Sequence, residues 1–255
     1  MINKVTINKS RLKLNCDMGE SFGLWSMGMD EDVMPWVDMA NIACGFHASD
    51  PDIMAKTLLL AKQHDVMVGA HPSYQDLQGF GRRSIPLSDD EITHCVIYQV
   101  GALVAMARMY DCKVEYIKPH GALYNDMMSN ESIFVAILAA AENFGLPVMI
   151  LAGVNNNRYL DLADQFNVPL LFEAFADRAY QDNGLLLPRS HPKAVHHLQD
   201  DIYHQVIQLA QYGSITSLNG AKIMLEADTI CVHGDNADSI AMVQRISQGL
   251  KSLGG

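Results

Sequence analysis

The sequence predicts an α/β protein in which residues 1–255 form a single parallel β/α barrel. Short apolar runs alternate with longer segments of helical spacing along the chain, a pattern typical of a parallel sheet. About seven strand and helix units fit into 255 residues, which favours a closed or nearly closed barrel over an open sheet. No change of composition, flexible linker or block of charge divides the chain, so we expect one domain.

The strands are predicted from short apolar runs that end in polar residues. They are expected at residues 12–15, 39–44, 66–68, 114–117, 148–151, 169–174 and 229–232. The third run is followed by two breakers, Gly69 and Pro72, which are expected to end that strand and to leave His71 at its tip.

The helices are predicted from helical spacing together with caps and breakers. Pro51 suits the first turn of a helix, with Ser49 or Asp50 as its cap. Ser88 and Glu91 have the spacing of a capping box at the start of the next helix. From there on, helices are expected at residues 89–110, 131–144, 158–166, 199–212 and 237–250.

Charge and hydropathy exclude two classes of partner. The formal net charge is −11, and no segment concentrates basic residues as nucleic-acid binding requires. Residues 1–10 lack the apolar core of a secretory signal, and the longest apolar run, 95–107, is shorter than the roughly 18 residues of a membrane span. The five cysteines form no CxxC pair, so reduced thiols are expected. We therefore expect a soluble cytoplasmic protein with no nucleic-acid or membrane partner.

Polar side chains follow most of the predicted strands. Of the ten histidines, those directly after strands are His47, His71, His120 and His233. The other polar residues near these strand ends are Asp17, Glu20, Asn41, Asp50, Lys118, Asp177, Arg178 and Asp235. In a parallel barrel the carboxyl ends of the strands meet at one face, where the active sites of such barrels lie. Burying many ionisable groups together costs stability unless they are paired or used, so we expect a functional site at this face.

Two kinds of chemistry fit these residues, and the sequence does not decide between them. Asp17, His47 and His71 can bind a divalent metal ion, because imidazole and carboxylate groups suit zinc and similar ions that activate water. Alternatively, a carboxylate or histidine acts as general base on water while Lys118 and the arginines at positions 82 and 83 hold an anion. The glycine-bearing stretch 79–83 lacks the spacing of a phosphate-binding P-loop, and no dinucleotide fingerprint follows the first strand.

Several long motifs, in order along nearly the whole chain, resemble those of the LamB/YcsF family. They are LNCDMGE at 14–20, NIACGFHASD at 41–50, GAHPSYQDLQGFGRR at 69–83, KPHGALYN at 118–125, FADRAY at 175–180, LLLPRS at 185–190 and CVHGDN at 231–236. Two departures from the family pattern are Lys13 in place of an aspartate and Ser49 in place of a glycine. Neither removes a candidate catalytic group.

The resemblance implies a (β/α)7-type barrel similar to carbohydrate deacetylases. It also implies a role as the A subunit of 5-oxoprolinase in the ATP-dependent opening of 5-oxo-L-proline to L-glutamate, with ATP as cofactor and 5-oxoprolinase subunits B and C as partners. On this basis the residues expected to be catalytic are Asp17, His47, His71, His120 and Asp235. The residues expected to bind substrate or phosphate are Glu20, Asn41, Arg82, Lys118, Arg178 and His233.

The main alternative is a metal-dependent amidohydrolase, similar to carbohydrate deacetylases, that acts without ATP. A scaffold that only positions partner subunits is the third interpretation. A stoichiometric divalent metal ion would favour the amidohydrolase. Changes at the strand ends that weaken assembly rather than turnover would favour the scaffold.

Overall fold

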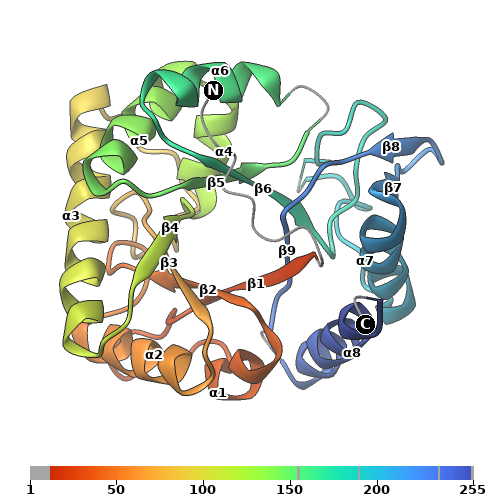
Figure 1. Ribbon diagram of the computed structural model, residues 1–255, viewed down its shortest axis with the longest axis horizontal. Helices are drawn as coiled ribbons and strands as arrows, with labels where there is room; N and C mark the ends of the chain where they lie inside the picture. Colours follow the sequence, from red (N-terminus) through yellow and green to blue (C-terminus); the bar gives the residue numbers. More distant parts are fainter. Residues whose placement is uncertain (1–11, 154–155, 189, 235, 254–255) are drawn as a thin grey trace.

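Parallel strands close into a barrel in the computed structural model, which describes residues 12–153, 156–188, 190–234 and 236–253. Their order is β1-β2-β3-β4-β5-β6-β9, and β9 pairs back to β1 (Figure 1). The barrel strands are β1 (Lys13–Met18), β2 (Met39–Ala43), β3 (Met67–His71), β4 (Val114–Ile117), β5 (Val148–Leu151), β6 (Leu170–Phe175) and β9 (Thr229–Cys231). This closed parallel sheet confirms the predicted β/α barrel.

Helices pack around the outside of the barrel, as Figure 1 shows from one end. They are α1 (Asp30–Val33), the 3-10 turn η1 (Met34–Trp36), α2 (Pro51–Gln63), α3 (Asp89–Met109), α4 (Gly121–Ser129), α5 (Glu131–Phe144), α6 (Asn157–Gln165), α7 (Gln199–Tyr212) and α8 (Ala237–Leu253). The predicted caps are present: the Asp50 carboxylate accepts from the first-turn amides of α2, and Ser88 and Glu91 form a capping box before α3.

Helix α3 is, within the described residues, the one helix whose length and apolar composition would suit a membrane span. It runs beside α5 in the outer layer, and its Val96, Val100 and Leu103 are fully buried in the core. A helix that packs against both the sheet and a neighbouring helix needs apolar residues on more than one side. Its place in the barrel therefore accounts for its composition.

The prediction that Gly69 ends the third strand was wrong, because this glycine lies inside β3. A Cβ atom at Gly69 would lie 2.1 Å from the ring of Tyr116 on β4. Glycine therefore makes room for the tyrosine ring. The strand continues to His71, which stands at its end as predicted.

Several short elements were not predicted. α1 and η1 fill the connection between β1 and β2, and α4 begins directly after His120. An antiparallel pair, β7 (Ser214–Thr216) and β8 (Lys222–Met224), follows α7. These elements are only a few residues long or begin inside a polar motif, so apolar periodicity does not mark them.

The barrel interior changes from apolar to polar along the strands. A separate buried cluster toward the amino ends of the strands consists of Met39, Tyr116, Met149 and Leu171. Because side chains alternate between the two faces of a strand, residues two positions further on point into the same interior. Asn41, Lys118 and Glu173 stand at such positions and are buried. Polar groups therefore gather toward the carboxyl ends of the strands.

Candidate active site

The carboxylate of Asp17 lies at the centre of the polar end of the barrel. Its Oδ1 accepts hydrogen bonds from Lys118 Nζ at 3.0 Å and from Asn41 Nδ2 at 2.8 Å, and its Oδ2 lies 3.3 Å from His71 Nε2. Burial raises the pKa of Asp17, but the opposing effects of His71 and Lys118 are larger and hold that pKa well below its usual range. Asp17 is therefore an ionised carboxylate at neutral pH.

Lys118 connects Asp17 to a second buried carboxylate, that of Glu173. Its ammonium lies 2.8 Å from Glu173 Oε1 and 3.2 Å from Asn15 Oδ1. Burial lowers the pKa of Lys118, but Asp17, Cys231 and Glu173 outweigh this effect, and the pKa lies well above its usual range. The three ammonium protons thus have acceptors on Asp17, Glu173 and Asn15. Lys118, predicted to bind substrate or phosphate, lines the cavity, and its hydrogen bond to Asp17 positions that carboxylate.

Asn41, predicted to bind substrate, lies beneath Asp17 instead of facing the cavity. Its side chain is fully buried and donates hydrogen bonds to Asp17 and to Asn15. Its Oδ1 accepts from the Tyr116 hydroxyl at 2.7 Å. The contacts of this amide therefore orient Asp17.

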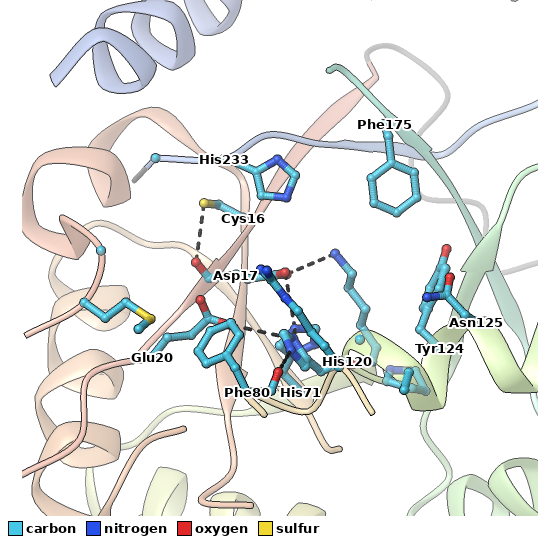
Figure 2. A pocket seen from close by; sticks show the side chains of 18 of the residues that line it. Cys16, Asp17, Glu20, His71, Phe80, His120, Tyr124, Asn125, Phe175 and His233 are labelled. Carbon is cyan, nitrogen blue, oxygen red and sulfur yellow. Dashed lines mark hydrogen bonds and ion pairs between the residues drawn. The ribbon is translucent and has the colours of Figure 1, made fainter. Parts of the chain in front are cut away.

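Three imidazole rings pack together beside Asp17. His47 stacks on His120 with ring centroids 3.8 Å apart, and His71 meets both rings edge-on. His71 Nε2 lies 2.9 Å from His120 Nδ1. Glu20 Oε1 lies 3.5 Å from His47 Nε2 and 3.7 Å from His120 Nδ1. Figure 2 shows Glu20, His71 and His120 pointing toward one another.

Burial keeps two of these rings neutral. It lowers the pKa of His47 well below its usual range, and His120 and His71 add to this effect. Burial, with His71, lowers the pKa of His120 to about 3. At neutral pH each of the two rings therefore keeps one nitrogen lone pair available.

The loop at residues 79–83 covers the histidines. The Phe80 ring packs edge-on against His47 and His120, and the Phe80 carbonyl oxygen lies 2.9 Å from His120 Nε2. A Cβ atom at Gly81, where φ is +65°, would lie 2.8 Å from His47 Cβ and from His120 Cδ2. Glycine therefore permits both the backbone conformation and the close approach.

The two adjacent arginines of this loop have different surroundings. Arg82 is exposed at the mouth of the cavity, with its guanidinium 5.2 Å from the centroid of the Phe80 ring. Arg83 pairs instead with the carboxylate of Asp76. Arg82 is therefore better placed than Arg83 to meet an anion in the cavity.

A cavity of about 590 Å³ opens above these groups. The charged and imidazole side chains along its floor are those of Asp17, Glu20, His71, Lys118 and His120. Phe175 and His233 lie on the opposite wall (Figure 2). A cavity of this size, with apolar walls and a few convergent polar groups, suits a small organic molecule.

The predicted residues on the β6 and β9 side have mainly structural contacts. Arg178 lines the cavity, but its guanidinium donates to two backbone carbonyls of the connection between β6 and α7. His233 Nδ1 lies 3.0 Å from Asp177 Oδ2. Asp235, predicted to be catalytic, lies outside the described residues.

Sequence reasoning missed Glu173 and Tyr124. Glu173 is fully buried on β6 beside Lys118, and Tyr124 lines the cavity from α4. Burial, reinforced by Glu173, raises the pKa of Tyr124 well above its usual range. The sequence did contain a signal for Glu173. It is a lone carboxylate in the apolar stretch 168–176, and it follows the inward-facing Leu171 by two residues, so it also points into the barrel.

The structure regroups the predicted metal ligands. The side chains whose donor atoms all lie within 4.8 Å of one another are Glu20, His47, His71 and His120. Asp17, predicted as a ligand with two of these histidines, belongs instead to a second group with Cys231 and His233. Imidazole and carboxylate donors suit zinc and neighbouring divalent ions, so the first group fits such an ion.

A parallel β/α barrel with an ionised carboxylate, a lysine and imidazoles at the carboxyl ends of its strands has the architecture of a barrel enzyme. The LamB/YcsF family profile matches residues 12–255, and the chain belongs to this family. The match confirms the resemblance found in the sequence motifs.

Named relatives match nearly the whole sequence of this chain. The chain is 62% identical over 247 residues to the 5-oxoprolinase A subunit from Vibrio vulnificus, a match to 97% of this chain and 100% of the relative. It is 60% identical over 250 residues to the 5-oxoprolinase A subunit from Vibrio campbellii, covering 98% of this chain and 100% of the relative. Among solved structures, a lactam utilization protein from Thermus thermophilus matches with a TM-score of 0.89 and 34% identity over 96% of this chain and 97% of its own.

Proposed function

We propose that this chain is the lactam-hydrolysing subunit of a cytoplasmic, ATP-dependent 5-oxoprolinase. Together with subunits B and C it converts 5-oxo-L-proline to L-glutamate, while ATP becomes ADP and phosphate. The observation that carries this proposal is the 62% identity, over 247 residues, to the 5-oxoprolinase A subunit of Vibrio vulnificus. The ionised Asp17 beside His71 at the floor of the cavity supports a hydrolytic role.

Opening a five-membered lactam requires activation, because an amide carbonyl is a poor electrophile. ATP supplies this activation by transfer of its terminal phosphoryl group to the lactam oxygen, which gives an imidate-like phosphate. A first water adds to the ring carbon, the carbon–nitrogen bond breaks, and the nitrogen takes up a proton as it becomes the amino group. A second water hydrolyses the resulting acyl phosphate to the side-chain carboxylate of glutamate and phosphate.

Asp17 and His71 are the pair that we assign to binding and deprotonating the attacking water. Asp17 Oδ2 and His71 Nε2 lie 3.3 Å apart, so one water at the cavity floor can contact both atoms. Lys118 holds Asp17 in place, and His47 and His120 support His71 from behind. These contacts favour a fixed geometry for the water.

The substrate is proposed to lie between Arg82 and the cavity floor. Arg82 at the mouth pairs with the carboxylate of 5-oxo-L-proline, and the aromatic rings of Phe80 and Phe175 flank the lactam ring. Arg178 and His233 complete the wall. Asp235 keeps its proposed catalytic role on the basis of the CVHGDN motif alone.

The lining of the cavity suits the lactam better than ATP. Asp17 and Glu20 face the cavity, Glu173 lies behind Lys118, and their negative charges oppose a triphosphate. The glycine-bearing loop at 79–83 packs on histidines instead of forming a phosphate cradle. We therefore assign no ATP contact to the described residues of this chain and propose that phosphoryl transfer takes place with the partner subunits.

Two substitutions test the assignment of the water-activating pair. Asp17→Asn and His71→Ala are compared with His94→Ala, an exposed histidine on α3, in mixtures with subunits B and C, ATP and 5-oxo-L-proline. Loss of general-base catalysis predicts that glutamate formation falls by about a hundredfold or more in the first two and stays unchanged in the third. Normal glutamate production by folded, assembled Asp17→Asn and His71→Ala chains would overturn the assignment.

A further inference from the structure

The hydrogen bonds of His71 and His120 leave two nitrogens facing each other without a shared proton. His71 Nδ1 lies 2.6 Å from the carbonyl oxygen of Lys118, and His120 Nε2 lies 2.9 Å from that of Phe80. A carbonyl oxygen only accepts, so each of these nitrogens carries its ring proton. In neutral rings, His71 Nε2 and His120 Nδ1 then present lone pairs to each other at 2.9 Å. This contact requires a positive group.

A proton on His71 Nε2 would satisfy that contact alone. The resulting imidazolium would donate to His120 Nδ1 or to Asp17 Oδ2. It would not supply a partner to His47. The side chain of His47 is fully buried, and its two ring nitrogens make no hydrogen bond within the described chain. His47 Nε2 also faces Glu20 Oε1 at 3.5 Å. A proton on His71 therefore leaves both ring nitrogens of buried His47 without a hydrogen bond, whereas a cation between the three rings would contact His47 as well.

We propose that Glu20, His47, His71 and His120 bind one divalent transition-metal ion with the ligand preferences of zinc. With metal–nitrogen bonds of about 2.0–2.1 Å, the donors of a tetrahedral site lie roughly 3.3 Å apart. Three of the six separations in this cluster are 2.9 Å for His71 to His120, 3.5 Å for His47 to Glu20 and 3.7 Å for His120 to Glu20, and all six are within 4.8 Å. These distances lie on both sides of the tetrahedral value, so small shifts of the side chains complete the site.

The supporting contacts of the cluster are those of a metal site. Carbonyl oxygens accept from the far nitrogens of His71 and His120, which fixes the tautomer and the direction of each lone pair. Gly81 and Phe80 pack over the rings and exclude solvent from one side. The ligands are therefore oriented before an ion is present.

Asp17 stays outside the ligand set, because the group whose donor atoms all lie within 4.8 Å of one another does not include it. The inference deepens the proposed function by dividing the roles of the water-activating pair. A bound ion would supply a water of lowered pKa, His71 would be one of its ligands, and Asp17 would be the neighbouring group placed to take a proton. Ion binding itself does not depend on the proposed reaction and is measured without substrate. Whether turnover needs ATP then separates the proposed 5-oxoprolinase from the ATP-independent amidohydrolase, since a metal site fits both.

Cobalt(II) provides the test, since it replaces zinc and reports its coordination by visible absorption. The full chain, freed of metal by a chelator and dialysed, is titrated with Co²⁺ by absorbance and by calorimetry. We expect one ion per chain, with bands typical of a four- or five-coordinate site. His47→Ala, His120→Ala and Glu20→Gln are expected to lower the affinity by more than about a hundredfold, because each removes a ligand. His94→Ala, on the exposed face of α3, and Asp17→Asn are expected to keep the site.

Three outcomes would overturn the proposal. They are absence of Co²⁺ binding by the wild-type chain, undiminished binding by the folded ligand variants, and loss of binding in Asp17→Asn as complete as in His47→Ala. Circular dichroism of each metal-free variant checks the fold. If a histidine variant does not fold, the Co²⁺ affinity of Glu20→Gln tests the site. This variant is expected to fold, because the Glu20 side chain is 16% exposed and its amide replacement fills the same space.

Discussion

The carboxyl ends of the strands form the rim of the barrel, and its two halves differ in how their ionisable side chains are held and buried. At the ends of β1 to β4, Asp17, His71 and Lys118 are held by each other and by neighbouring side chains, with the histidine and the lysine almost completely buried. At the ends of β6 and β9, the pair of Asp177 and His233 is more open, with 22% and 30% of the two side chains exposed.

This difference indicates that one side of the rim carries the reacting groups and the other side shapes the cavity wall. Buried ionisable groups cost free energy of folding and persist only where their partners are well placed. On the β1 to β4 side the partners are other site residues, so one substitution disturbs several groups. On the other side Arg178 bonds to loop carbonyls, and its contacts fix the loop that walls the cavity. Substitutions on the two sides are therefore expected to have unequal effects.

Replacing Lys118 should have the largest effect. Lys118→Met leaves the carboxylates of Asp17 and Glu173 buried without their shared cation. We expect a loss of about 3–5 kcal/mol in the free energy of unfolding, a melting temperature lower by about 10 °C, and no measurable turnover. Thermal unfolding followed by circular dichroism measures this, with Lys222→Met on the exposed side of β8 as the control. An unchanged melting temperature would show that the buried ion pairs are not needed.

Glu173→Gln should have the next largest effect, and on turnover rather than on binding. The amide still accepts a hydrogen bond from Lys118 but does not balance its charge, so the ammonium draws closer to Asp17. We expect kcat to fall by about tenfold to a hundredfold with little change in KM, because Glu173 lies behind Lys118, away from the substrate. Steady-state kinetics of the assembled enzyme separate the two constants. A raised KM at normal kcat would place Glu173 in contact with substrate instead.

Arg82→Gln tests the mouth of the cavity, where the two halves meet. A charge-assisted hydrogen bond to the substrate carboxylate is worth about 1.5–3 kcal/mol, so KM for 5-oxo-L-proline should rise about tenfold to a hundredfold. Turnover at saturation should change little, because Arg82 is remote from the water-activating pair. Arg83→Gln is the matched control, since Arg83 pairs with Asp76. Equal effects of the two substitutions would contradict the role of Arg82.

Asp177→Asn should have the smallest effect. A partly exposed ion pair contributes under about 1 kcal/mol to the free energy of unfolding. Because the pair lies away from the water-activating residues, we expect glutamate formation within about threefold of normal. Burial raises the pKa of Asp177, but His233 outweighs it, and the pKa falls below the usual 3.8. The stability that this pair adds is therefore present above pH 3.8 and is lost as the pH falls through the folded-state pKa. Urea unfolding at pH 7 and at lower pH values measures the free energy of unfolding of variant and wild type. The difference between them should shrink on acidification, and a difference that grows would contradict the predicted pH dependence.

Much of the fold follows from local signals in the sequence. The predicted bounds of α5, α7, β4 and β5 agree with the structure, because glycines or prolines end the periodic segments. Gly145 and Gly213, for example, cap helices with φ of +63° and +58°. Helix α4 was missed because it begins at Gly121, within a motif whose glycine and proline indicate a turn.

The position of the site could be predicted, but its internal contacts could not. Alternation along the strands places Asp17, His71 and Lys118 at one end of the barrel. The stacking of His47 on His120 depends on side-chain torsions and on the path of the loop over them. Those features come from packing between segments far apart in the sequence, and no local pattern records them.

The most direct test of the proposed division of the rim is glutamate release from 5-oxo-L-proline and ATP by this chain combined with subunits B and C. We predict release only when this chain is present, a fall to background with Asp17→Asn, and near-normal release with Asp177→Asn. Release without this chain, or equal losses from the two aspartate substitutions, would contradict the claim that the β1 to β4 side of the rim performs the hydrolysis.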